Sequence, residues 1–463
     1  MKASHLRHRI IALLIFDAII TYSSLILALI LRLGVEGTKY QLNERNGWLK
    51  ASFITLVCIL SMHLYDLYEY TVIKNRLELL LRLVQAVGVA WIFLAIFFYF
   101  VPEMMIGRGT SIYAVLLVIT FLSIWRVSLH FLLGHPDIGE RVAIVGTNKP
   151  AIDTAEAILH RPDAGYRLIG LIAENHSVKL EKKPEIKILG SVDELYQIVK
   201  RENIDRLVIA VLERRGNFPT ETLLKLSLAG EVLIEECASF YERITGQVHL
   251  DMLRPSWLIF NSRRKQTRFS YILREVVHRA LALIGLIVSL PIAIITAILI
   301  KIESEGDIFY RQERTGKNGK TFQLIKFRSM RVDAEKNGQP VWAQPNDDRV
   351  TRVGKIIRKA RIDEIPQFWN ILKGEMSFVG PRPERPQFVE QLAKQIPFYE
   401  HRHLTQPGLT GWAQINYPYG SSVEDAKKKL QYDLYYIKNQ SLTLDLVIVL
   451  ETIKTVIFGR GGR

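Results

Sequence analysis

Residues 358–384 read RKARIDEIPQFWNILKGEMSFVGPRPE, in which two adjacent carboxylates, Asp363 and Glu364, follow two arginines, Arg358 and Arg361. The stretch ends in GPRP, whose two prolines fix the backbone. Adjacent carboxylates repel each other unless a cation or a proton relieves them. A divalent metal on one leaves the other free as a nucleophile, and arginines bind phosphate oxygens. The stretch therefore indicates phosphoryl chemistry, although a lone Asp-Glu pair is more often a solvated helix end.

Two further motifs accompany this stretch, Lys326–Met330 (KFRSM) and Pro407–Gln414 (PGLTGWAQ). With them, the sequence from Tyr271 to Arg463 resembles the bacterial polyprenyl-phosphate sugar-1-phosphate transferases, the undecaprenyl-phosphate glycosylphosphotransferase family. Members of that family start exopolysaccharide and O-antigen chains. The PRPERP form of the turn, Pro381–Pro386, is similar to that of the exopolysaccharide-initiating branch.

Length and composition allow two or three domains, at least one of them in a membrane. The chain has 463 residues, of which 49% are hydrophobic, and its formal net charge is +15. A basic surplus suits anionic lipid or phosphate ligands, and the sequence holds no nucleic-acid-binding motif. The two cysteines, Cys58 and Cys237, lie far apart, so neither a disulfide framework nor a zinc site is expected.

Residues 1–136 are expected to form a four-span transmembrane bundle. Apolar segments lie at about 10–31, 48–65, 79–101 and 112–133, each near the roughly 20 residues that cross a bilayer. Asp17 and Arg126 fall within the first and fourth segments, where structural pairing is favoured over a catalytic role. The distribution of lysine and arginine places both ends of the bundle in the cytoplasm. Together with the resemblance, this implies a bacterial inner-membrane protein with a cytoplasmic catalytic part.

Residues 137–260 predict a Rossmann-like α/β domain of the nucleotide-binding type. Strands are expected at 142–145, 168–172, 207–211 and 232–235, and helices at 151–160, 192–201 and 220–228. Gly146 opens the first loop, but Lys149 and Pro150 stand where a dinucleotide needs glycine. A regulatory or assembly module, with dimerisation as one possibility, is favoured over a cofactor site.

Residues 261–463 are expected to combine a re-entrant membrane helix with a small α/β catalytic domain. The run 280–300 carries no charge but has basic residues on both flanks, whereas a spanning helix has one poorly basic side. Ser289 and Pro291 interrupt it, which predicts a break rather than an ordinary fifth span. A full crossing would place Asp363 outside the cell, away from nucleotide sugars. His278 stands where many members of the resembled family carry aspartate.

A hairpin is expected across 309–326, turning at Asn318-Gly319. Lys326 and Arg328 would share one face of its second strand and grip a diphosphate, or else form an exposed basic edge. A basic helix is expected at 350–360. The tail, 442–456, is expected either to lie on the membrane or to pack against the domain.

The resemblance implies a role for each residue of the motifs. Asp363 attacks the phosphorus nearest the sugar, UMP leaves, and polyprenyl phosphate takes up the phosphosugar from Asp363. Glu364 holds Mg²⁺, and Lys326 and Arg382 neutralise the developing charge. The family's basic residue falls at Arg358, with Arg361 as the second choice.

The remaining candidates surround this centre. Glu384 could orient Arg382, and the loop that ends at Gln414 is expected to close over the nucleotide. The segment Asn416–Gly420 replaces an arginine found in other branches of the family. A general base at His401 or His403 is less favoured, because attack on phosphorus needs little base help.

The function expected is transfer of sugar-1-phosphate from a UDP-sugar, of glucose or galactose, to undecaprenyl phosphate at the lipid bilayer. No nucleic acid is expected as a partner, and a homo-oligomer is possible. One alternative is a membrane-anchored nucleotide-sugar epimerase or dehydratase, but its glycine-rich loop and Tyr-x-x-x-Lys pair are not visible in 141–250. The other alternative is a non-enzymatic scaffold for polysaccharide assembly.

Overall fold

The chain forms two compact units, Met1–Ile244 and Thr245–Arg463. The computed structural model describes residues 5–65, 67–68, 76–133, 139–161, 164–174, 186–211, 219–253, 268–331, 348–417, 420 and 422–457. The division falls earlier than the expected limit at residue 260. The reason is that Val248 and Leu250 are buried against Leu430 and Leu434, within the core of the second unit.

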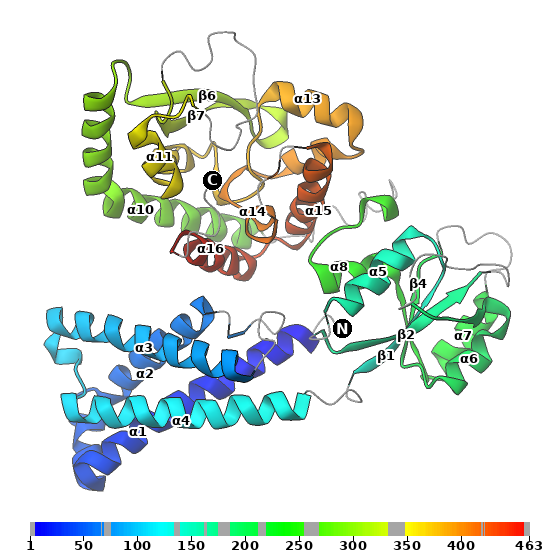
Figure 1. Ribbon diagram of the computed structural model, residues 1–463, viewed down its shortest axis with the longest axis horizontal. Helices are drawn as coiled ribbons and strands as arrows, with labels where there is room; N and C mark the ends of the chain where they lie inside the picture. The colour runs from blue at the N-terminus through cyan, green and yellow to red at the C-terminus, as the bar shows by residue number, and fades with distance from the viewer. Residues whose placement is uncertain are drawn as a thin grey trace. The chain divides into compact units, whose positions relative to one another are not determined.

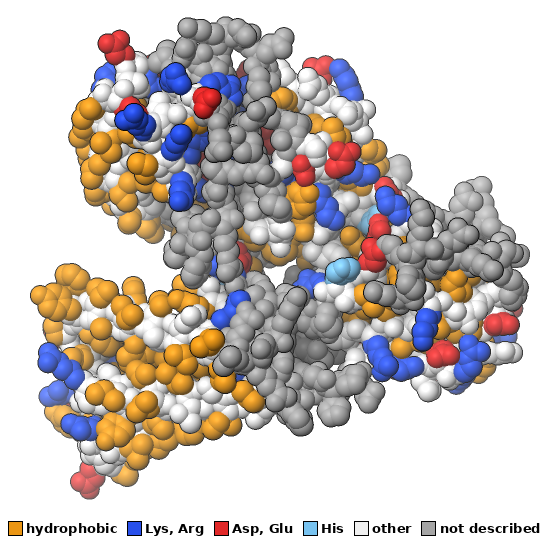
Figure 2. Space-filling view, in the orientation of Figure 1, with side chains coloured by type: hydrophobic (Ala, Val, Ile, Leu, Met, Phe, Trp, Pro, Cys, Tyr) orange, Lys and Arg blue, Asp and Glu red, His pale blue; other side chains and the backbone are white. Residues whose placement is uncertain are grey.

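The first unit begins with four long helices. Small side chains such as Ala28, Ala51 and Ala90 are buried where the helices meet, which lets their backbones approach closely. Hydrophobic side chains also cover the outer surface of these helices (Figure 2). Each helix contains a window long and apolar enough to cross a membrane. The four predicted segments are therefore helices, and their path through a bilayer stays a prediction. The helices are α1 (His5–Glu44), α2 (Gly47–Leu64), α3 (Arg76–Phe100) and α4 (Arg108–Leu133), with a 3₁₀ turn, η1, at Pro102–Met104.

The charges inside the first and fourth helices are paired. Arg126 donates to the Asp17 carboxylate at 2.5 Å, and its other terminal nitrogen donates to the Leu67 carbonyl at 2.9 Å. Both side chains are almost completely buried. These contacts confirm the structural pairing expected for Asp17 and Arg126. Each buried charge is thereby compensated by an oppositely charged partner.

A five-stranded sheet forms the second part of the first unit. Its strand order is β3-β2-β1-β4-β5, and every described pairing is parallel. The predicted parallel α/β sheet is confirmed, but β3 and the last helix, α8, were not anticipated. The strands are β1 (Glu140–Val145), β2 (Tyr166–Ala173), β3 (Ile188–Ser191), β4 (Arg206–Ile209) and β5 (Leu233–Glu236).

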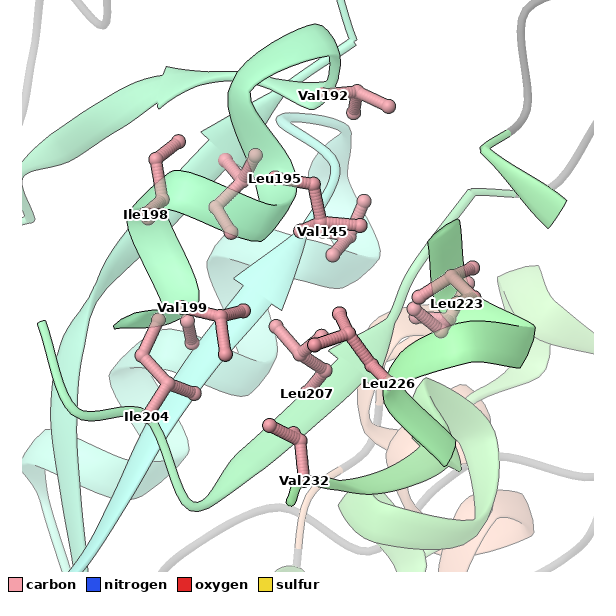
Figure 3. Packing of buried hydrophobic residues seen from close by; sticks show 13 residues of the cluster. Val145, Val192, Leu195, Ile198, Val199, Ile204, Leu207, Leu223, Leu226 and Val232 are labelled. Carbon is pink, nitrogen blue, oxygen red and sulfur yellow. The ribbon is translucent and has the colours of Figure 1, made fainter. Parts of the chain in front are cut away.

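Helices cover both faces of this sheet: α6 and α7 lie on one side, and α5 and α8 on the other (Figure 1). Leu195, Leu207 and Leu226, from α6, β4 and α7, meet in one of its apolar cores (Figure 3). In the first loop, Asn148 caps α5 and also donates to the Ala210 carbonyl at 2.7 Å. Nucleotide binding by this loop stays untested. The helices are α5 (Lys149–Leu159), α6 (Leu195–Arg201, preceded by the 3₁₀ turn η3, Val192–Glu194), α7 (Thr220–Leu228) and α8 (Cys237–Thr245).

The second unit is built around the long helix α10 (Arg268–Glu303). The predicted hairpin is confirmed: β6 (Phe309–Thr315) pairs antiparallel with β7 (Thr321–Phe327), and Asn318 in the turn has φ of 56°. A second sheet pairs β8 (Ser377–Val379) in parallel with β9 (Gly408–Thr410). The remaining helices are α11 (Arg352–Lys359), α12 (Gln367–Leu372), α13 (Pro386–Gln395), α14 (Trp412–Asn416), α15 (Val423–Asn439) and α16 (Leu442–Ile457), and the 3₁₀ segments are η4 (Leu250–Met252), η5 (Lys317–Gly319), η6 (Ile362–Glu364) and η7 (Tyr399–Leu404).

Helix α10 is continuous from Arg268 to Glu303 but bends. Figure 1 shows it as two arms joined by a sharp bend, and Pro291 lies inside it. Ser289 donates to the Leu286 carbonyl at 3.3 Å, next to the Ile287 carbonyl that Pro291 leaves without its usual donor. Most of its apolar window is exposed. A bent, apolar helix suits the re-entrant path, which remains a proposal.

The tail helix α16 has two different faces. Ile448 is fully buried with Val379 and Tyr436, whereas Leu446 and Ile453 are exposed. The packing expected for one face is confirmed, and the other face keeps the apolar exposure that a membrane-surface position would require.

Candidate active site

The two central carboxylates lie in the short 3₁₀ turn η6, directly after α11. Arg361 ends the preceding turn in the left-handed conformation, with φ of 56°, which is uncommon for a residue other than glycine. This conformation reverses the chain between α11 and η6. Asp363 and Glu364 are each only 8% exposed, so the turn places two carboxylates side by side in a largely buried position.

Lys326, from the end of β7, lies between the two carboxylates. Its Nζ is 3.2 Å from Glu364 Oε1 and 3.8 Å from Asp363 Oδ2. Two segments 37 residues apart thus meet at one point. The charge of Lys326 relieves the repulsion that two neighbouring carboxylates would otherwise suffer.

Two arginines complete the cluster. Arg382 donates to Glu364 Oε1 at 3.0 Å, and Arg361 lies 3.7 Å from Glu364 Oε2. The side chains of Lys326, Arg382 and Arg361 all keep some exposure, at 19%, 31% and 33%. These cations therefore neutralise Glu364 and still present charge to an anion arriving from solvent.

The electrostatic environment separates the two carboxylates. Burial alone would raise the pKa of Glu364, but Lys326, Arg382 and Arg361 outweigh it and lower that pKa well below its ordinary value. Burial raises the pKa of Asp363, Lys326 opposes this, and the charge of Glu364 adds to it. Glu364 is therefore a fixed anion, and Asp363 is the more basic of the pair.

Of the other predicted site residues, Arg358 lies near the carboxylates, whereas Arg328 and Gln414 contact other groups. Arg358 is close enough for its charge to lower the pKa of Asp363. Arg328 does not reach the carboxylates: it lies beyond the end of β7 and donates to the Ser304 and Glu305 carbonyls, both at 2.8 Å. Gln414 donates to the Leu409 carbonyl at 3.3 Å, within its own loop.

A glycine in the loop of Gln414 allows the loop to approach the backbone of another segment closely. A Cβ on Gly408 would lie 2.0 Å from the Gly380 nitrogen, so no side chain fits there. This contact joins the PGLTGWAQ loop to the GPRP turn that carries Arg382. Part of the Asn416–Gly420 segment lies outside the described residues.

Among the described contacts of Asp363 and Glu364, none involves a histidine. Burial, and then Arg402, lower the pKa of His403 to about 4, so its ring is neutral near pH 7. His278 on α10 bonds Ser377 at 2.5 Å and Asp445 of α16 at 3.1 Å. Asp445 also accepts from Arg274 at 2.5 Å. The carboxylate beside His278 therefore comes from Asp445 of α16.

Two residues near Arg382 were missed by the sequence reasoning. Arg402 of η7 donates to the Arg382 carbonyl at 3.0 Å and to Asp433 of α15 at 2.9 Å. A signal for Asp433 exists in the sequence, because it interrupts the apolar face formed by Leu430, Leu434 and Ile437 at helical spacing.

Known proteins match both halves of the chain. The family model described as bacterial sugar transferase matches residues 269–459, and the model described as CoA-binding domain matches residues 63–214. The first of these regions contains the whole carboxylate cluster described above.

Three curated relatives are similar over large parts of the chain. A UDP-N-acetylgalactosamine-undecaprenyl-phosphate N-acetylgalactosaminephosphotransferase of Aeromonas hydrophila is 46% identical over 48% of this chain and 52% of its own length. Two UDP-glucose:undecaprenyl-phosphate glucose-1-phosphate transferases, from Xanthomonas campestris pv. campestris and Klebsiella pneumoniae, are 32% and 31% identical over 68% of this chain. These matches span 66% and 67% of those two proteins, so the chain covers between about half and two thirds of the length of these three relatives. By the family model and these relatives, the chain belongs to the bacterial sugar transferase family.

Proposed function

We propose that this protein is a phosphoglycosyl transferase that moves sugar-1-phosphate from a UDP-sugar to undecaprenyl phosphate and releases UMP. The observation that carries the proposal is the convergence of Lys326, Arg361 and Arg382 on the buried pair Asp363-Glu364. The activities named for the relatives support the class of reaction. The first membrane step of exopolysaccharide synthesis is the setting proposed for it.

The nucleophile in this proposal is Asp363. It is the carboxylate that the cations hold less tightly, with one contact to Lys326 at 3.8 Å, whereas Glu364 has three cationic neighbours. Its raised pKa makes it the stronger nucleophile of the two once it is deprotonated.

The reaction runs in two displacements. An Asp363 oxygen forms a bond to the phosphorus nearest the sugar, and the bond from that phosphorus to UMP breaks, with UMP keeping the electron pair. A phosphate oxygen of undecaprenyl phosphate then attacks the same phosphorus, and the bond to Asp363 breaks. The product is undecaprenyl-diphosphate-sugar, and the Asp363 carboxylate is regenerated. Lys326 and Arg382 stabilise the charge that develops on the phosphoryl oxygens.

The carboxylate pair also fits Mg²⁺. An ionised, largely buried Glu364 offers the hard oxygen ligand that this ion prefers, and one or two carboxylates suffice when substrate phosphates supply further ligands. Among the described residues no cluster of three or more His, Cys, Asp or Glu could form a protein cage for a metal. Glu364 would hold the ion, which when bound neutralises charge on the diphosphate.

The lipid substrate enters from the membrane side in this proposal. The exposed apolar side chains of α10 include Leu283, Ile287 and Leu290, and they belong to the same unit as the carboxylate cluster. A re-entrant α10 would keep this unit on the cytoplasmic face, where both UDP-sugar and the phosphate end of the lipid are present.

The test uses the full chain, purified in detergent with Mg²⁺ and undecaprenyl phosphate. UMP release is measured with UDP-glucose, UDP-galactose and UDP-N-acetylgalactosamine in turn, for the parent and for Asp363→Asn. We expect release by the parent with one donor and none by the variant. Asp307→Asn, which changes an exposed carboxylate of the same unit, is the matched control and should keep the parental rate.

A second measurement isolates the covalent step. Labelled UMP is incubated with UDP-sugar and enzyme in the absence of undecaprenyl phosphate. If a phosphosugar forms on Asp363, label exchanges into UDP-sugar without the acceptor. Turnover in the complete mixture combined with no exchange would refute the two-step route, and no UMP release with any donor would refute the proposed reaction.

A further inference from the structure

The segment that carries Arg382 is held by its backbone carbonyls at four successive residues. The Pro381 carbonyl accepts from the Gly408 nitrogen at 2.9 Å, and the Glu384 carbonyl accepts from the Thr315 nitrogen at 2.9 Å. Between them, the Arg382 carbonyl accepts from Arg402 at 3.0 Å, and the Pro383 carbonyl accepts from Arg314 at 3.0 Å. Three separate elements, β9, η7 and β6, supply these donors.

The sequence of the segment explains why it needs such donors. Pro381 and Pro383 have no backbone N–H, so neither can donate to a neighbouring strand. The carbonyls are then the main backbone groups by which the segment can be fixed. The Arg382 and Pro383 carbonyls are held by arginine side chains, which a substitution can remove.

Arg402 also has two buried partners besides the Arg382 carbonyl. It donates to the Asp433 carboxylate at 2.9 Å and to the Tyr399 hydroxyl at 2.7 Å, and it is only 6% exposed. Asp433 is 2% exposed. A planar guanidinium can serve three partners at once in a set direction, which a lysine ammonium cannot reproduce.

We propose that Arg402, held by Asp433 and Tyr399, is a positioning residue that fixes the backbone of Arg382 so that its guanidinium meets Glu364 and the substrate phosphates. Arg402 does not touch substrate in this arrangement and acts only through Arg382. The inference rests on the proposed function for the role of Arg382, but the backbone contact on which it depends is independent of any reaction.

The first test is a double-mutant cycle on UMP release by the full chain, with Arg402→Lys, Arg382→Ala and the double variant. A misplaced catalytic group loses rate, so Arg402→Lys should lower kcat by about 10²-fold and change KM much less. In the Arg382→Ala background the same change should cost almost nothing further. Asp433→Asn, which leaves the Arg402 side chain itself intact and weakens one of its contacts, should show a smaller loss with the same pattern.

Arg274→Lys is the matched control, because Arg274 has the same kinds of partner, Asp445 and Tyr436, in the same unit. Among the described contacts, none of its hydrogen bonds goes to residues 381–384. The fold-loss in kcat caused by Arg274→Lys should be the same in the parent and in the Arg382→Ala background, as expected for independent sites. If the fold-loss caused by Arg402→Lys is also the same in both backgrounds, the positioning role is wrong.

Hydrogen exchange separates this inference from the proposed function. Peptides that cover residues 380–385 should exchange faster in Arg402→Lys than in the parent or in Arg274→Lys, whether or not the protein turns over any donor. Unchanged exchange in these peptides would overturn the inference even if UMP release confirmed the reaction. Faster exchange in Arg402→Lys, combined with no UMP release by the parent, would support the fixing of the Arg382 backbone by Arg402 and would count against the proposed reaction.

Discussion

Lys326 is the residue whose removal the geometry makes most informative. At an effective dielectric of about 20, unit charges at its distances of 3.2 and 3.8 Å from Glu364 and Asp363 interact by about 5 and about 4 kcal/mol. Measured losses on breaking buried pairs are smaller, at roughly 3–5 kcal/mol in total, because solvent and neighbouring groups adjust. Lys326→Met keeps the length of the side chain and removes its charge. If about 3 kcal/mol of this loss is added to the activation free energy of the reaction, kcat at pH 7 falls about 10²-fold.

The pH dependence gives this prediction a second readout. Lys326 is the strongest of the charges that lower the pKa of Asp363. Without it, that pKa rises further and less of the proposed nucleophile is deprotonated at pH 7. The acid limb of the kcat profile should therefore move to higher pH. UMP release is measured from pH 6 to pH 9 for the parent, Lys326→Met and Lys326→Arg, which retains the charge. The reasoning would be refuted if kcat of Lys326→Met at pH 7 were within threefold of the parental value, or if its pH profile matched that of the parent.

Three other changes test separate parts of the second unit. The pKa of His403 is about 4 in the folded protein and near 6.5 in an unfolded chain, so the unfolded state binds the proton more tightly. The free energy of unfolding should therefore fall by up to about 3 kcal/mol as the pH drops from 6.5 to 4. Thermal unfolding measured at pH 7.5 and at pH 5.0 should show a smaller difference in melting temperature for His403→Gln than for the parent. Ser422→Ala removes the hydroxyl that accepts from the Asp425 nitrogen at 3.0 Å in the capping box of α15, and should cost about 1 kcal/mol in denaturant unfolding. Gly408→Ala places a Cβ against the Gly380 backbone and should lower both the melting temperature and the rate of UMP release, whereas an unchanged melting temperature would contradict the packing of these two segments.

Much of the fold follows from patterns that are local in the sequence. The apolar segments of the bundle, the alternation of strands and helices after residue 140, and the Asn318-Gly319 turn each need only a few neighbouring residues to be recognised. The short strand β3 was missed because its four residues include a glycine and show no alternation. Helix α8 was missed although four of its buried residues, Cys237, Phe240, Tyr241 and Ile244, recur at the spacing of a helix.

The site residues that belong to recognisable sequence motifs could be predicted. The residues whose contacts depend on the tertiary fold could not. Asp363, Glu364, Lys326 and Arg382 were named from motifs, and the structure brings them together. The inference for Arg328 assumed that the strand continued past Phe327, where it in fact ends, so the alternation of faces no longer applies. Arg402 could not be identified in this way, because its partners, Arg382 and Asp433, lie 20 and 31 residues away.

The early start of the second unit decides how the catalytic part can be isolated. A fragment that began at residue 261 would lack Val248 and Leu250, and would leave the apolar faces of Leu430 and Leu434 open to water. It would also lose the Gly246 carbonyl, to which the Trp412 indole donates at 2.8 Å from the loop beside the GPRP turn. A protease cut near residue 260 would therefore leave a catalytic fragment that keeps every motif and still aggregates, whereas a fragment begun at Thr245 carries its own core.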